Sequence, residues 1–105
     1  MIELRRFIRT PVDAPASLLP KGASEAITGR ARDISVGGMF IETAQVLPFG
    51  TDVTVRVRLP QGKEELALPG LVRWVRTDGM GIQFGLLGAK ETHEITEIVR
   101  RGSKR

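Results

Sequence analysis

The sequence predicts a mostly β fold: a small six-stranded antiparallel β-barrel with one C-terminal α-helix. Short runs of alternating apolar and polar residues recur along the chain, and turn-forming Gly and Pro residues separate them. The apolar period changes to that of a helix only near the C-terminus. Six or so short strands with one closing helix are typical of a small barrel. Side chains fill a barrel of this size, so we expect any ligand to bind on its outer face or rim.

The expected barrel spans residues 12–86 and is preceded by an arm. Residues 1–11 show no convincing period, and we predict that they form a mobile segment. Apolar residues alternate over 12–18, although Pro15 makes this strand irregular or places it at an edge. Five further runs are predicted to be strands, at residues 26–34, 39–41, 53–59, 65–77 and 80–84.

The run at 65–77 carries two features that bear on its position. Pro69-Gly70 in its middle implies an edge position or a bulge that bends the strand. Trp74 has the same parity as the apolar residues before it, so it suits the barrel core at least as well as a ligand contact. Arg73 has the opposite parity and is a weaker candidate for a ligand contact.

One amphipathic helix is predicted over residues 89–101. Its narrow apolar stripe consists of Ile95, Ile98 and Val99. Residues 102–105 form a basic tail that we expect to fray.

Composition excludes several classes of function. A chain of 105 residues, 41% apolar and 27% charged, is one ordinary globular domain. No apolar run approaches the roughly 20 residues that cross a bilayer, and no signal-peptide pattern is present, so we expect no membrane insertion and a cytoplasmic location. There is no cysteine and one histidine, His93, which excludes disulfides and most transition-metal sites. The glutamates have no paired partner in a catalytic motif, so we predict no enzyme activity, no metal and no cofactor.

The net charge of +4 is concentrated at the two ends of the chain. Residues 100–105 carry +4 and residues 1–9 carry +2, so the 90 residues between them carry −2. A slightly acidic body does not follow a long polyanion, which requires many phosphate contacts on one face. We therefore expect no nucleic-acid partner.

Two stretches carry the most informative chemistry. Arg5, Arg6 and Arg9 place three guanidiniums within five residues near the chain end. The stretch Asp33–Gly38 combines a carboxylate, a hydroxyl and two glycines in a short turn. A carboxylate accepts from the N1–H and N2–H donors of guanine, and arginine binds the O6/N7 edge or a phosphate. Together these groups are suited to a guanine nucleotide, and glycine allows the backbone to approach it closely.

Arg5-x-x-x-Arg9 followed by Asp33-x-Ser35-x-x-Gly38 resembles the signature pair of the PilZ domain family. Gly70-Leu71-Val72-Arg73-Trp74 and Gly81-Ile82-Gln83-Phe84 fit the same family, and the similarity covers about residues 4–100. The resemblance implies a six-stranded barrel with a C-terminal helix that acts as a bacterial receptor for cyclic di-GMP. It also implies that the arginine arm is loose without ligand and wraps onto the bound nucleotide.

Carried over by position, the resemblance implies a ligand site made of Arg5, Arg6, Arg9, Asp33, Ser35, Gly37, Gly38 and Trp74. The arginines would hold guanine edges and phosphates, and Asp33 would accept from guanine N1 and N2. Ser35 would contact phosphate or base, and Trp74 could lie beside a base. Leu4 stands where some members of the family carry another arginine, so a second, intercalated ligand molecule is disfavoured.

Other interpretations of these residues are simpler. The arginines could be a solvated charge run, and Asp33 and Ser35 could be turn residues that bond their own backbone. A ligand-blind barrel of the same fold could serve as an adaptor in pilus or motility machinery, although the intact arginine and Asp33–Ser35 motifs speak against it. We expect a monomer or weak dimer that signals through an external effector protein.

Overall fold

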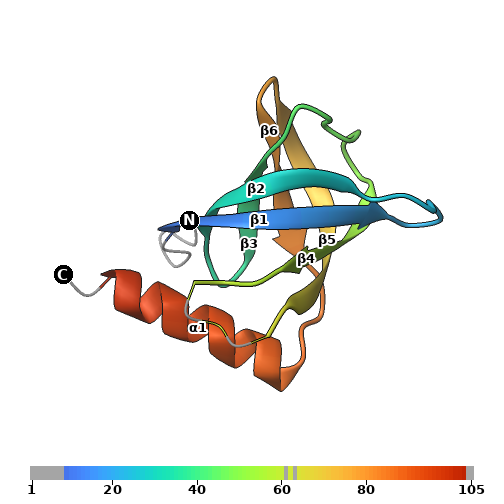
Figure 1. Cartoon of the computed structure of the whole chain (residues 1–105). Helices are drawn as coiled ribbons and strands as arrows, with labels where there is room; N and C mark the ends of the chain where they lie inside the picture. The colour runs from blue at the N-terminus through green and yellow to red at the C-terminus, as the bar shows by residue number, and fades with distance from the viewer. Residues whose placement is uncertain (1–8, 61, 63, 104–105) are drawn as a thin grey trace, which may run out of the picture.

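The computed structural model describes residues 9–60, 62 and 64–103, and Figure 1 shows the arrangement of their elements. The predicted six-stranded antiparallel barrel with one C-terminal helix is confirmed. Its elements are β1 (Thr10–Pro20), β2 (Ile27–Ile34), β3 (Gly38–Glu42), β4 (Asp52–Val57), β5 (Leu66–Arg76), β6 (Gly79–Phe84) and α1 (Ala89–Ser103).

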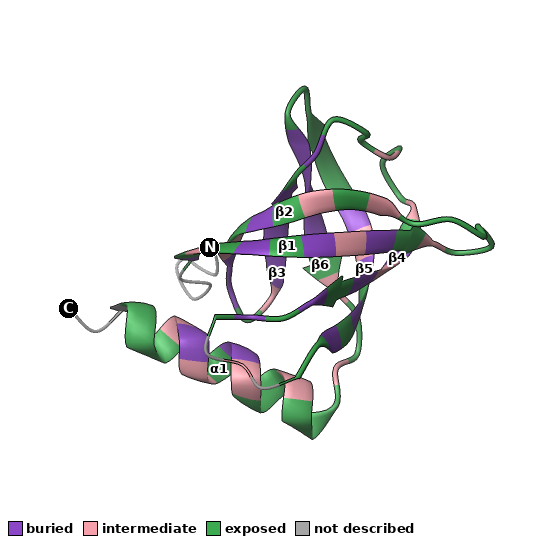
Figure 2. Cartoon of the chain, viewed as in Figure 1, coloured by how far each residue is buried: buried purple, intermediate pink, exposed green. Residues whose placement is uncertain are grey.

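The strands close into a barrel in the order β1-β2-β3-β6-β5-β4, with every neighbouring pair antiparallel. Alternate residues point inward, and Figure 2 shows the buried positions recurring along the strands. Fully buried side chains from all six strands fill the interior, among them Leu18, Ile34, Ile41, Val55, Leu68, Val72 and Met80. Side chains thus fill the interior of the barrel, as the sequence predicts.

Two prolines lie just outside the paired register with one of the two neighbouring strands. Pro15 pairs with Arg30 of β2, but the pairing of β1 with β4 begins one residue later, at Ala16. Pro69 pairs with Thr54 of β4, and the pairing of β5 with β6 begins at Gly70. Because proline has no N–H to donate to a second neighbour, these positions accommodate it.

Most element boundaries differ from the prediction by one or two residues, and two of the differences bear on the predicted arm and tail. β1 begins at Thr10, inside the segment 1–11 that was expected to be an arm, because its pairing with β2 extends to Ile34. The helix ends at Ser103 instead of at residue 101. Residues 1–8, which hold most of the predicted arm, lie outside the described part of the chain, as do residues 104–105 of the predicted tail.

Helix α1 lies below the barrel in Figure 1, and its apolar stripe faces the core. Ile95 and Ile98 are buried and Val99 packs partly against the same cluster, as the stripe predicts. Glu91 in the first turn and Arg100 in the last turn favour the helix dipole. No helix within the described residues is both long enough and apolar enough to cross a bilayer.

Candidate functional site

The residues of the candidate site lie on the outer face of four neighbouring strands, β2, β3, β6 and β5. The strand register aligns Asp33 with Phe40, Phe40 with Gly81, and Gly81 with Trp74. A carboxylate, two aromatic rings and a glycine therefore form one row across the sheet. The register brings Asp33 and Trp74 into this row although they are far apart in the sequence.

Two glycines of β6 leave the space over which the rings of Phe40 and Trp74 lie. A Cβ at Gly81 would overlap the indole of Trp74, and a Cβ at Gly79 would come within 2.5 Å of the Phe40 ring. Because neither glycine has a side chain, the two rings reach over β6 from opposite sides and stack. Their centroids are 5.5 Å apart and their planes differ by 17°, which is a favourable offset arrangement.

Replacing Gly81 with alanine is expected to displace Trp74 while the barrel remains folded. The added Cβ collides with the indole, which is 43% exposed and free to swing into solvent. We expect a red-shifted tryptophan emission, from the only tryptophan of the chain, and a loss of stability of about 1 kcal/mol. An unchanged emission spectrum in the G81A variant would contradict this arrangement of the rings.

A β-bulge turns Trp74 outward. The register of β5 against β6 shifts between Val72 and Trp74, so Arg73 is the extra residue. Before the bulge Leu66, Leu68 and Val72 point into the core, whereas Arg73 and Trp74 are both exposed. The interpretation of Trp74 as a core residue is therefore wrong, and so is the placement of Arg73 on the face opposite to it. Pro69-Gly70 marked the irregularity of the strand but not the position of the bulge.

Arg9 and Asp33 form an ion pair at the edge of this row. The Arg9 Nη2 donates to Asp33 Oδ1 at 2.8 Å, and the two side chains are 46% and 31% exposed. A pair this exposed is held weakly, with a typical value of about 0–1 kcal/mol. Either side chain can therefore give up this ion pair and bind a ligand at little cost in free energy.

The turn at residues 35–38 forms one wall of the site. The Ser35 amide donates to the Gly38 carbonyl at 2.8 Å, and the Ser35 hydroxyl accepts from the Gly37 amide at 3.2 Å. The same hydroxyl donates to the Gly38 carbonyl at 3.4 Å, and Ser35 is 2% exposed. Ser35 thus bonds its own turn, as the simpler interpretation expects. The turn is fixed to β6, since the Phe84 amide donates to the Gly37 carbonyl.

Two cavities flank Trp74, and Arg9 and Trp74 line both of them. The first, of about 540 Å³, is also lined by Ser35, Gly37, Gly38, Met39, Arg73, Gly81, Ile82 and Gln83. Its charged lining residues are Arg9 and Arg73, with no carboxylate among the described residues around it. The second, of about 430 Å³, is also lined by Arg32, Asp33, Phe40, Glu42, Arg76 and Asp78. The first cavity is thus electropositive, whereas the second balances cations with carboxylates.

Arg76 covers the aromatic pair from the end of β5. Its guanidinium carbon lies 4.6 Å from the centroid of Phe40 and 5.8 Å from that of Trp74, within the range of cation–π attraction. Its Nε and Nη2 each donate to a carboxylate oxygen of Asp78 at 3.2 Å. This bidentate pair raises the pKa of Arg76 and lowers the pKa of Asp78.

The structure brings together all the predicted site residues that it describes. Arg9, Asp33 and Trp74 face the two cavities, and the turn of Ser35, Gly37 and Gly38 closes one side. Arg5 and Arg6 lie outside the described residues. Phe40 and Arg76 were missed, because no local pattern distinguishes them and only the strand register places them beside Trp74. Among the described residues, no group of three His, Cys, Asp or Glu side chains is placed to hold a metal ion.

Comparison with known proteins identifies the family of the chain. The PilZ domain family matches residues 3–101. The cellulose synthase catalytic subunit (UDP-forming) of Xanthomonas axonopodis pv. citri is 35% identical over 83 residues, which are 78% of this chain. The chain spans 11% of the length of that curated relative, so the match covers one part of a much larger enzyme.

Three solved structures share the fold of this chain. The PilZ domain of CeSA from a cellulose-synthesizing bacterium has a TM-score of 0.71 at 22% identity, covering 89% of this chain and 95% of its own. The Bacillus subtilis inhibitor of motility (MotI/DgrA) has a TM-score of 0.75 at 21% identity, covering 99% of this chain and 55% of its own. The PilZ domain of YcgR from Escherichia coli, described with c-di-GMP, has a TM-score of 0.71 at 11% identity, covering 95% and 92%. With the barrel, the turn and the matched motifs in place, the chain belongs to the PilZ domain family.

Proposed function

We propose that this chain is a bacterial receptor for cyclic di-GMP that binds the nucleotide on the outer face of β2, β3, β6 and β5 and catalyses no reaction. The observation that carries the proposal is the row Asp33–Phe40–Gly81–Trp74 beside an electropositive cavity. A guanine nucleotide needs an acceptor for its N1–H and N2–H, a flat surface for its base and cations for its phosphates. The face supplies each of these groups.

In this proposal the phosphates and one base of the ligand bind in different cavities. The phosphates occupy the cavity lined by Arg9, Arg73 and the 35–38 turn, where no described carboxylate opposes them. One base lies against the exposed face of Trp74 and extends toward Asp33 in the second cavity. Arg9 lines both cavities, so it can leave Asp33 for the ligand when the carboxylate turns to guanine.

The output of the receptor comes from the segment before Arg9. We propose that Arg5 and Arg6, which lie outside the described residues, add their guanidiniums when this segment closes over the bound nucleotide. The ordered segment and the ligand then form a surface that an effector protein recognises. Affinity is expected to be moderate, because ordering the segment costs about 1–2 kcal/mol per backbone residue fixed.

Tryptophan fluorescence tests the proposal directly, because Trp74 is the only tryptophan and is half exposed beside the proposed base. Titration with cyclic di-GMP is expected to change the emission with saturation at micromolar concentrations, which corresponds to roughly 8 kcal/mol of binding free energy. GTP and single-stranded DNA, each at two salt concentrations, serve as controls and are expected to bind at least tenfold more weakly. Equal responses to all three would indicate nonspecific binding of anions and contradict the proposal.

A second candidate is a ligand-blind adaptor of the same fold. The observation that favours it is that the motif side chains already satisfy one another, Arg9 with Asp33 and Ser35 with its own turn. A chain that gives no response to cyclic di-GMP in the same titration, while folded, would support this candidate.

A further inference from the structure

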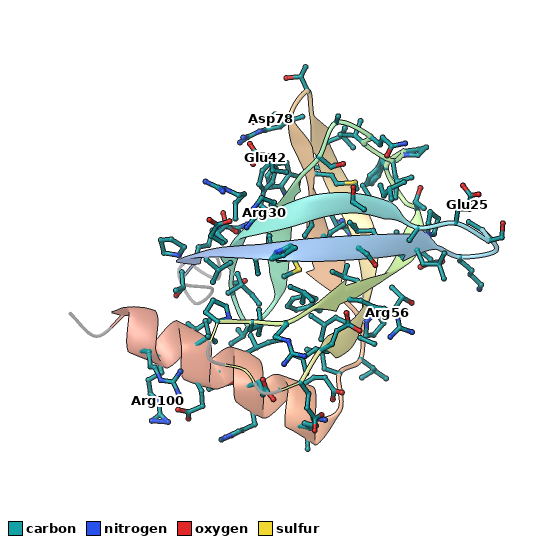
Figure 3. All side chains as sticks on the ribbon, viewed as in Figure 1. Glu25, Arg30, Glu42, Arg56, Asp78 and Arg100 are labelled. Atoms are coloured by element: carbon teal, nitrogen blue, oxygen red, sulfur yellow. The ribbon has the colours of Figure 1, made fainter. Side chains whose placement is uncertain are left out.

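An arginine outside the recognised motifs occupies the second cavity together with Asp33. Arg76 comes from the end of β5, stacks over Phe40 and is held by Asp78 across the β5–β6 turn. Figure 3 shows Asp78 at the tip of the β5–β6 hairpin, on the same side of the molecule as Glu42 and Arg30. The bidentate pair and the ring contact together restrict the orientation of the guanidinium.

Asp33 and Arg76 share one cavity beside the aromatic pair. Both residues line the 430 Å³ cavity, and Asp33 contributes through space to raising the pKa of Arg76. They come from strands on opposite sides of β3, which carries Phe40. Asp33 of β2 pairs with Phe40, whereas Arg76 of β5 pairs with Gly79 of β6, two residues from the Gly81 that pairs with Phe40. A carboxylate acceptor and a guanidinium donor thus lie in one cavity with a stacked pair of aromatic rings.

The guanidinium retains donors for a ligand while it is bound to Asp78. An arginine has five N–H hydrogens, and the bonds to Asp78 use the one on Nε and one on Nη2. The two hydrogens on Nη1 and the second on Nη2 form a fork that can donate to two adjacent acceptors. Guanine presents such a pair, O6 and N7, on the edge next to the one that carries N1–H and N2–H.

We propose that Arg76 determines base specificity by donating to O6 and N7 of a guanine that lies against Trp74, while Asp33 accepts from N1–H and N2–H of the same base. This inference rests on the proposed binding of cyclic di-GMP at this face. The two contacts together read both polar edges of one base. Adenine, which has an amino donor at the place of O6, meets the fork with a donor instead of an acceptor.

Calorimetric titration of the full chain with cyclic di-GMP and with its 7-deazaguanine analogue tests this assignment. The analogue has a C–H in place of N7, so it lacks one acceptor of the fork and leaves the N1–H and N2–H edge intact. The wild type is expected to bind the analogue about tenfold more weakly, since a bidentate base contact is worth roughly 1–3 kcal/mol. Arg76→Met removes the fork but keeps an apolar stem over Phe40, and it is expected to shrink the ratio of the two dissociation constants about tenfold.

Arg56→Met is the matched control, because Arg56 is an exposed strand arginine paired with Glu65 on another part of the barrel (Figure 3). This variant is expected to keep the wild-type ratio. A second comparison uses cyclic di-IMP, whose base lacks the N2 amine: the R76M variant is expected to discriminate against it as the wild type does, because Asp33 is intact. If R76M and wild type show the same ratio for the deaza analogue, Arg76 does not read N7 and the assignment is overturned. If the wild type binds neither nucleotide, the proposed function is overturned with it.

Discussion

Replacing Arg9 with alanine is expected to reduce the affinity for cyclic di-GMP by about 100-fold or more and to leave the free protein nearly as stable as the wild type. Arg9 lines both cavities, so its loss removes a charge-assisted contact from each part of the ligand. In the free protein its partner is the half-exposed Asp33, and an exposed ion pair contributes only about 0–1 kcal/mol. Calorimetry gives the affinity, and thermal unfolding is expected to show a shift below about 4 °C.

Arg30 offers a matched control for this experiment. Its Nε donates to Asp13 at 2.7 Å with a side-chain exposure of 48%, close to the values for Arg9. Arg30 lines neither of the two cavities. The R30A variant is therefore expected to bind cyclic di-GMP within about twofold of the wild type, given how little such exposed pairs contribute. A large loss of stability in R9A would mean that Arg9 holds the fold, and its effect on binding would then be indirect.

Replacing Gly38 with alanine is expected to destabilise the barrel by about 2–3 kcal/mol, the cost of a side chain forced into a packed position. A Cβ at Gly38 would overlap the carbonyl oxygen of Ile82 and lie 3.3 Å from the Cα of Gln83. Both atoms belong to the backbone of β6, which is paired on its two sides and cannot move away as a side chain can. Thermal unfolding is expected to show a fall in Tm of roughly 10–20 °C.

Gly85→Ala is the control for this substitution. Its Cβ would lie 3.7 Å from the nearest atom of Pro69, an ordinary contact, so the G85A variant is expected to unfold within about 3 °C of the wild type. If G38A unfolded at the wild-type temperature, the close approach of β3 to β6 behind the 35–38 turn would be wrong.

Much of the fold could be predicted because each strand carries its own alternation of apolar and polar residues. The pattern identified all six strands, and the stripe Ile95, Ile98 and Val99 identified the helix. The prolines at 15 and 69 correctly indicated irregular strands, since the register of β1 shifts between Pro11 and Ala14 and that of β5 between Val72 and Trp74. The alternative of an edge position is wrong, because the barrel is closed. Alternation failed at Trp74, because a bulge inserts one residue before it and turns it to the outer face.

The candidate site could be predicted only where its residues form local motifs. Arg9 and the turn of Asp33, Ser35, Gly37 and Gly38 are recognisable in sequence, and the structure places them together. Phe40 and Arg76 have no such signal. They join the site through the pairing of β3 and β5 with β6, and this register depends on long-range contacts that a local pattern does not encode.

The roles of the motif residues follow from what surrounds them. Ser35 is bonded within its own turn, whereas the partly exposed side chains of Arg9 and Asp33 are bonded to each other. A ligand can therefore displace the ion pair without unfolding the turn. This arrangement separates the residue that shapes the turn from the two that we propose to contact the ligand.

The central claim is that residues 1–8 close over a bound cyclic di-GMP. Isothermal titration calorimetry of the wild-type chain, together with NMR spectra of the amide resonances of residues 1–8 with and without the nucleotide, tests it most directly. The account predicts a saturable heat with a micromolar dissociation constant and large shifts of those resonances when the ligand binds. Neither heat nor shifts, from a chain that is folded, would contradict it and leave the barrel as a scaffold for another partner.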